Sequence, residues 1–160
     1  MKSLLTTPLV ILALLAPLNA SADVEKGSDA YLAGNYATAV QEFKKATEQG
    51  NASAQFNLGV MYSNGRGVLQ DDKEAVKWYR LAAEQGHVPA QYNLGLMYRN
   101  GEGVLQDNVY AHMWWNIVAS EGNETAKKGR DIIAKQMTPS QIEEAQKLAR
   151  ECVAKEYKGC

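Results

Sequence analysis

Cysteine and histidine are scarce in this sequence and an excess of positive charge is absent, which together exclude several classes of protein. The 160-residue chain contains two cysteines and two histidines, and its 17 basic residues are balanced by 18 acidic ones. Nucleic-acid-binding proteins usually carry an excess of basic residues on one face, which this balance does not offer. Neither His87 nor His112 has a histidine or cysteine three or four residues away, as a metal-binding helix face requires. We therefore expect no nucleic-acid partner, no metal and no cofactor, and we expect both histidines at the surface or its rim.

No set of residues indicates catalysis. An enzyme needs reactive side chains that converge, and Ser21 and Ser28 have no base nearby in the sequence. The acidic cluster between Asp71 and Glu74 suits the capping of a helix N-terminus, which explains it without a general acid. The tryptophans occupy helical positions that favour the core over a sugar-binding platform; these are Trp78, Trp114 and Trp115. The sequence therefore predicts no catalytic residue, and we do not expect an enzyme.

Long apolar runs are also missing, except at the N-terminus. The run LLTTPLVILALLAPL follows Lys2 and precedes the small residues NASAD. Prolines interrupt it, and it is shorter than the roughly 20 apolar residues of a membrane span, so a cleaved signal peptide is favoured over a membrane anchor. The A-x-A pattern of Ala20 and Ala22 predicts a signal peptide over residues 1–22, with cleavage after Ala20 as the alternative. We expect a periplasmic or secreted protein without stable membrane insertion, whose net charge without residues 1–22 is −2.

Both cysteines, Cys152 and Cys160, lie within the last nine residues. In an oxidising compartment such a local pair predicts a disulfide rather than two free thiols. Eight residues of helix rise about 12 Å, whereas bridged Cα atoms lie about 4.4–6.8 Å apart. The helix that holds Cys152 must therefore end before Cys160, and Gly159 is well placed for the reversal of the chain.

A two-glycine loop is written twice, 36 residues apart. AQFNLGVMYSNGRGVLQD, at 54–71, and AQYNLGLMYRNGEGVLQD, at 90–107, are identical at 14 of 18 positions. In each unit apolar residues recur at helical spacing before and after the loop, which predicts two helices. The loop glycines permit the positive φ that ends a helix, and the final aspartate can cap the next helix. Gly59 and Gly95, inside the first helices, indicate that two helices pack too closely there for a Cβ.

The tandem pattern A-x-x-x-L-G-x-M-Y-x-N-G-x-G-V-x-Q-D, followed by A-x-x-W-Y-x-x-A-A-E-Q-G, resembles the Sel1-like repeat (SLR) family, relatives of the tetratricopeptide repeat. The resemblance covers residues 54–122. It implies an all-α, right-handed α-solenoid of stacked antiparallel helix pairs that holds proteins or peptides, with no conserved catalytic residue. Residues 27–46 lack the long loop and resemble a tetratricopeptide repeat instead.

The chain is expected to end its stack with a capping helix. Thr138, Pro139 and Gln141 predict a helix N-terminus in front of an amphipathic segment, as an open-ended stack needs at its end. The expected units are the signal peptide, a tetratricopeptide-like repeat at 23–50, Sel1-like repeats at 51–86 and 87–122, and a degenerate repeat with the capping helix and disulfide at 123–160.

The first helices of the repeats are expected to line the concave surface of the stack. With Leu58 at the centre of the buried face, a step of about 100° per residue puts another set of side chains on the opposite side. This set joins aromatic and aliphatic groups to positive charge at one end: Phe56, Val60, Ser63, Tyr92, Leu96, Arg99, Lys128 and Lys135. Such a surface suits a peptide or helix with apolar anchors and an acidic group. The alternative is that the aromatic rings pack on the adjacent repeat.

The predicted function is that of a monomeric scaffold that binds a segment of another envelope protein in its concave groove. Two alternatives stand beside it. Some exported, cysteine-rich SLR proteins have been linked to binding or hydrolysing cell-wall-type ligands such as β-lactams, but they carry a cysteine pair in each repeat and this chain has one pair. The other alternative is a structural spacer that associates with itself through its tryptophan-bearing surfaces.

Overall fold

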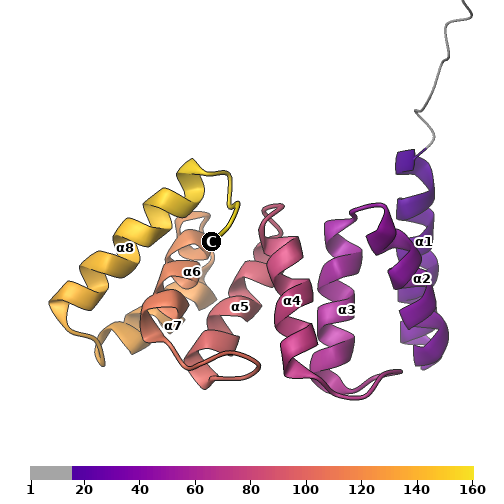
Figure 1. The fold of residues 1–160 in the computed structure, drawn as a ribbon, viewed down its shortest axis with the longest axis horizontal. Helices are drawn as coiled ribbons and strands as arrows, with labels where there is room; N and C mark the ends of the chain where they lie inside the picture. Colours follow the sequence, from indigo (N-terminus) through magenta and orange to yellow (C-terminus); the bar gives the residue numbers. More distant parts are fainter. Residues whose placement is uncertain (1–15) are drawn as a thin grey trace, which may run out of the picture.

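The structure is a computed structural model that describes residues 16–160, where all regular structure is α-helical (Figure 1). The signal peptide predicted for residues 1–22 lies mostly outside the described residues. Within 16–160, eight helices follow one another: α1 (Ala16–Leu32), α2 (Tyr36–Glu48), α3 (Ala52–Asn64), α4 (Asp72–Ala83), α5 (Val88–Asn100), α6 (Asn108–Ser120), α7 (Glu124–Ala134) and α8 (Pro139–Ala154). None of these helices is both long and apolar enough to cross a membrane.

Each helix from α1 to α6 packs on the helix that follows it, so the chain builds a stack of antiparallel pairs. In Figure 1 the long α3–α4 and α5–α6 loops lie on one edge of the stack, and the α2–α3 and α4–α5 turns lie on the other. The end of the stack is different, because α8 packs chiefly on α6 rather than on α7. The last helix therefore covers the second helix of the preceding pair instead of completing a pair with α7.

Glycines inside the first helices let the two members of a pair approach closely. A Cβ added at Gly59 in α3 would lie 2.5 Å from the ring of Tyr79 in α4, far inside van der Waals contact. The first pair keeps this kind of contact although its loop is four residues shorter. The corresponding glycine and ring in the other pairs are Gly27 with Phe43, and Gly95 with Trp115.

The repeated loop ends one helix and begins the next, as predicted. Gly65 and Gly101 adopt the left-handed conformation at the ends of α3 and α5, with φ of 63° and 72°. Asp71 and Asp107 accept hydrogen bonds from the first backbone N–H groups of α4 and α6.

The second glycine of each loop lies against the preceding repeat. A Cβ added at Gly67 would lie 2.5 Å from the carbonyl oxygen of Tyr36, the first residue of α2. A Cβ added at Gly103 would likewise clash with the carbonyl oxygen of Asp72, the first residue of α4. Each long loop therefore closes its own repeat on the repeat before it, which explains why both glycines of the loop recur.

The buried residues follow the predicted stripes, with one correction. Trp114 and Trp115 are each 1% exposed and Trp78 is half-buried, so the tryptophans belong to the core. His112 was expected at the surface, and this is wrong: it is 3% exposed, because α6 is covered by α5, α7 and α8. Burial lowers the pKa of His112, and the nearby positive charge of Arg130 lowers it further.

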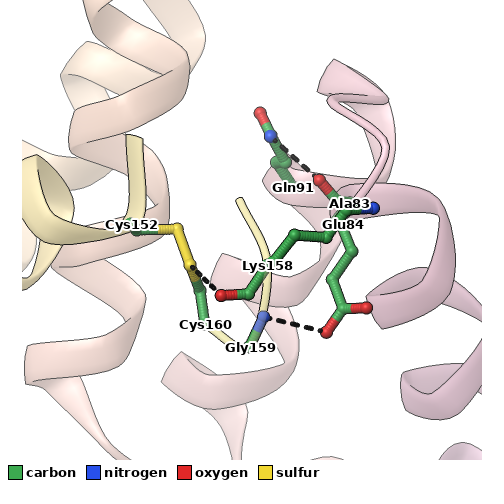
Figure 2. The surroundings of a disulfide bond; sticks show 7 residues. All are labelled: Ala83, Glu84, Gln91, Cys152, Lys158, Gly159 and Cys160. Atoms are coloured by element: carbon green, nitrogen blue, oxygen red, sulfur yellow. Dashed lines mark hydrogen bonds between the residues drawn. A yellow bond between two sulfur atoms is a disulfide. The ribbon is translucent and has the colours of Figure 1, made fainter. Parts of the chain in front are cut away.

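The predicted disulfide between Cys152 and Cys160 is present, with the Cα atoms 5.6 Å apart (Figure 2). α8 ends two residues after the first cysteine. The chain then reverses through Glu156 and Tyr157, whose φ values of 51° and 66° are left-handed. Gly159, with φ of 67°, completes the reversal. It was the one residue predicted from the sequence to make this reversal.

Candidate partner-binding groove

Phe56 in α3 is held between two repeats. Its ring centroid lies 5.8 Å from that of Tyr79 in α4 and 4.9 Å from that of His87 at the start of α5. Burial lowers the pKa of His87, which favours the neutral form of the ring that packs on Phe56. Val60, one turn further along α3, is half-buried against the same apolar cluster. Phe56 and Val60 are therefore fixed in place and only partly exposed.

Tyr92 and Leu96 in α5 pack towards the next repeat. The ring centroids of Tyr92 and Trp115 lie 6.0 Å apart, and the Trp115 indole N–H donates a hydrogen bond to the Tyr92 carbonyl oxygen at 3.1 Å. Leu96 packs against the buried cluster that contains Trp115 and Ile133. Both side chains are half-buried. Packing on the adjacent repeat therefore accounts for much of the surface of these two residues.

Ser63 lies at the edge of the core. It is half-buried at the end of α3. Burial raises the pKa of the Tyr79 hydroxyl, and the polar side chains of Asn93 and Ser63 oppose that rise. Ser63 therefore faces the Tyr79 hydroxyl as well as the surface.

An apolar cleft of about 420 Å³ lies between α1 and α3. Leu32, at the end of α1, is 83% exposed and forms part of its wall. Sequence reasoning missed the contribution of α1, because the first repeat departs from the 36-residue spacing that revealed the others. The residues that line the cleft are Ser28, Tyr31, Leu32, Phe43, Phe56, Asn57 and Val60.

The α1 wall of this cleft is positioned by the α3–α4 loop. The guanidinium of Arg66 donates a hydrogen bond to the hydroxyl of Tyr31. It also lies 5.3 Å from the ring centroid of Tyr31 and 5.6 Å from that of Tyr36, within the range of cation–π contacts. Arg66 therefore fixes Tyr31 relative to the second repeat.

A second, more polar cleft of about 290 Å³ lies between α5 and α7. Tyr92 forms part of its wall. Its lining combines apolar groups with amides and a hydroxyl: Val88, Pro89, Tyr92, Asn93, Asn123 and Thr125.

Positive charge lies further along the two helices whose first turns line the second cleft. Arg99 in α5, Lys128 in α7 and Lys135 just after α7 are exposed, and among the residues that the structure describes none of the three forms an ion pair. Arg130, on the same helix as Lys128, is instead paired with Asp131 at 2.7 Å. Of the residues that line the α1–α3 cleft, none is charged. The first helices therefore offer an apolar site at α1–α3 and basic side chains at α5–α7.

The side chains of both clefts are suited to binding. They supply aromatic and aliphatic surface, amides that include two at equivalent positions (Asn57 and Asn93), and several hydroxyl groups. Within residues 16–160, no three His, Cys, Asp or Glu side chains are placed to share a metal ion.

Known proteins share both the repeat sequence and the fold. The Sel1 repeat profile matches residues 52–87 and 88–123. A solved Sel1 repeat protein from Oxalobacter formigenes is 39% identical, with a TM-score of 0.64 over 71% of this chain and 88% of that one. A protective antigen present in uropathogenic Escherichia coli strains, which displays an SLR fold, is 34% identical with a TM-score of 0.82 over 86% of this chain. The chain belongs to the Sel1 repeat family.

The extent of these matches differs. The chain spans 30% of the length of the Escherichia coli antigen, so it corresponds to a part of that longer protein. Among curated proteins, none gives a significant match.

Proposed function

We propose that this Sel1 repeat protein is a binding scaffold that holds a peptide or helical segment of another envelope protein. One observation carries the proposal: the apolar cleft between α1 and α3, in which Leu32 remains 83% exposed. Concave apolar sites with exposed large side chains are common places for a partner to anchor. The cleft would take an aliphatic or aromatic side chain of the bound segment.

The charges on α5, on α7 and just after α7 favour a partner that carries an acidic group at a distance from its apolar anchor. Arg99, Lys128 and Lys135 are exposed cations on a chain whose overall charge is slightly negative. An acidic group near them would gain charge–charge attraction, and binding would weaken as salt screens that attraction. The bound segment would place its apolar residue between α1 and α3 and its acidic residue towards α7.

Export and a monomeric, non-catalytic character belong to the same proposal. The A-x-A pattern that ends at Ala22 supports export, and so does the relative described as a protective antigen, since antibodies meet antigens outside the cytoplasm. The protein isolated from the envelope of its host should begin at Asp23. Turnover of a chromogenic β-lactam that a single substitution abolishes would replace this proposal by an enzyme. Self-association in sedimentation experiments would replace it by a spacer.

Selection of a displayed library of random peptides on the protein tests the groove. Enriched peptides should combine an aliphatic or aromatic position with an acidic one, and the Leu32→Ser variant should bind them about tenfold more weakly. Leu69→Ser is the matched control, because Leu69 is 91% exposed in the α3–α4 loop and does not line the cleft. Both variants should unfold at the wild-type temperature, since neither leucine is buried. Equal affinity of wild type and Leu32→Ser for every enriched peptide would rule out this site.

A further inference from the structure

The residues after α8 fold back onto another repeat (Figure 2). The disulfide between Cys152 and Cys160 closes this strap, residues 155–160, onto α8. The backbone N–H of Gly159 donates a hydrogen bond to Oε1 of Glu84, which follows α4, at 3.4 Å. The strap therefore links the terminal helix to the α4–α5 turn.

Tyr157 supplies the largest side chain of the strap. A Cβ added at Gly86, in the α4–α5 turn, would lie 3.3 Å from the Tyr157 ring. The Tyr157 hydroxyl donates a hydrogen bond to Glu121, just after α6, at 3.4 Å. Partial burial raises the pKa of Tyr157, and the negative charge of Glu121 raises it further. Tyr157 thus contacts the turns of two successive repeats.

The same α4–α5 turn also supports the wall of the α1–α3 cleft. His87 stacks on Phe56, which lines the α1–α3 cleft, with the ring centroids 4.9 Å apart. The Gln85 amide donates a hydrogen bond to the Gln55 side-chain oxygen at 2.7 Å. Gly86, which the strap contacts, therefore lies between two residues that hold α3. A displacement of the strap can therefore change the position of Phe56 through the α4–α5 turn alone.

The strap is held by the disulfide and by backbone hydrogen bonds, among them one from the Tyr157 N–H to the Cys152 carbonyl oxygen at 2.9 Å. Glu156 and Tyr157 have φ values of 51° and 66°, a left-handed conformation that residues other than glycine rarely adopt. The disulfide limits the alternatives open to this short segment, and cleavage removes that limit. The opened strap is expected to relax to more favourable backbone angles and to leave Gly86.

We propose that the oxidation state of Cys152 and Cys160 regulates the α1–α3 cleft. The disulfide holds the strap on the α4–α5 turn, and its reduction releases the strap. The inference rests on the proposed function, because it concerns regulation of the same site. A dithiol reductant cleaves the S–S bond by exchange: the two cysteine sulfurs gain two electrons and two protons as thiols, and the reductant becomes a disulfide. Release of the strap loosens the turn, separates His87 from Phe56 and weakens binding. The oxidised protein is the binding form.

NMR spectra and peptide affinities of the oxidised and the dithiol-reduced protein test this inference. Reduction should accelerate hydrogen exchange at the amides of Gly86 and His87, which are hydrogen-bonded to α4, by about tenfold or more. It should also remove the contact between the rings of His87 and Phe56 and weaken the enriched peptides several-fold. Tyr157→Ala should do the same with the disulfide intact. Lys158→Ala, an exposed position of the same strap, is the matched control and should have no effect.

The outcomes separate this inference from the proposed function. Unchanged exchange at the turn after reduction overturns the control of the turn by the strap, and faster exchange with unchanged affinity overturns its link to the groove. If no peptide binds the oxidised protein, the proposed function fails. The inference is then decided by whether reduction separates the rings of His87 and Phe56. The Cys152→Ala/Cys160→Ala variant cannot form the disulfide and must behave as the reduced protein.

Discussion

The backbone of Gly59 faces the ring of Tyr79 across the α3–α4 pair, with no room for a Cβ between them. Tyr79 is 3% exposed, so its ring has no open space into which it can move. The glycine therefore sets the distance between the two helices of this repeat.

Gly59→Ala should destabilise the protein by about 1–3 kcal/mol, because the added methyl group overpacks the contact with Tyr79. This loss should appear even though alanine favours a helix by about 1 kcal/mol over glycine. Urea unfolding followed by circular dichroism measures it. Ser53→Ala, at an exposed position of α3, is the control and should change the free energy of unfolding by less than about 0.5 kcal/mol. A stabilised Gly59→Ala variant would show that the pair can open at no cost.

Removal of the disulfide should cost about 2.5 kcal/mol, because the bridge closes a short loop in the unfolded chain. The Cys152→Ala/Cys160→Ala variant and the reduced wild type should both show this loss in denaturant unfolding. Thiol titration confirms that the wild type is oxidised at the start. If the variant is as stable as the oxidised protein, the strap adds nothing to global stability.

Acidification should destabilise the protein through its histidines. Burial lowers the pKa values of His87 and His112 below the usual 6.5, so the unfolded chain takes up protons first as the pH falls. This contribution to stability is complete above pH 6.5 and is lost as the pH falls from there through the folded-state pKa values. Unfolding titrations at about pH 7.5 and about pH 5 measure the loss. His87→Gln/His112→Gln should show a smaller loss, and an unchanged loss would assign the effect to other groups.

Loss of the cap at Asp107 should weaken α6. Its carboxylate accepts hydrogen bonds from the N–H groups of Val109 and Tyr110 at 2.8 and 3.1 Å. Asp107→Ala should cost about 1 kcal/mol in thermal unfolding, whereas Asp107→Asn keeps an acceptor and should cost less. Equal losses in the two variants would indicate that the negative charge, rather than the hydrogen bonds, stabilises the helix.

Much of the fold could be predicted because its signals are local. Helix starts depend on one or two side chains, as at Thr138, whose hydroxyl accepts from the Gln141 N–H while the Gln141 side chain accepts from the Thr138 N–H. Positive φ at Gly65 depends on the absence of a Cβ. The position of α8 on α6, and the burial of His112 that goes with it, depend on which distant helix offers the better surface. No local pattern reports that choice.

The candidate site shows the same division. Phe56 and Val60 were identified from helical periodicity, and they line the α1–α3 cleft. Tyr31 and Leu32 were not, because the α1–α2 connection is shorter than the repeated loop and shifts α1 out of the register used for comparison. Periodicity also could not show that Tyr92 is only partly exposed, because the same ring that faces the surface packs on Trp115.

The contacts of Gly67 with Tyr36 and of Gly103 with Asp72 give the α3–α4 repeat both surfaces of one joint, because its loop contacts the repeat before it and its second helix is contacted by the loop after it. A copied segment of 36 residues, inserted in register, would bring a new loop and a new helix start together. The stack can therefore lengthen by tandem duplication in its middle without the evolution of a new interface. This joint is not repeated at α1–α2, whose connection lacks the long loop, or at α6, which α8 covers. The much greater length of the Escherichia coli antigen is the kind of difference that this joint permits.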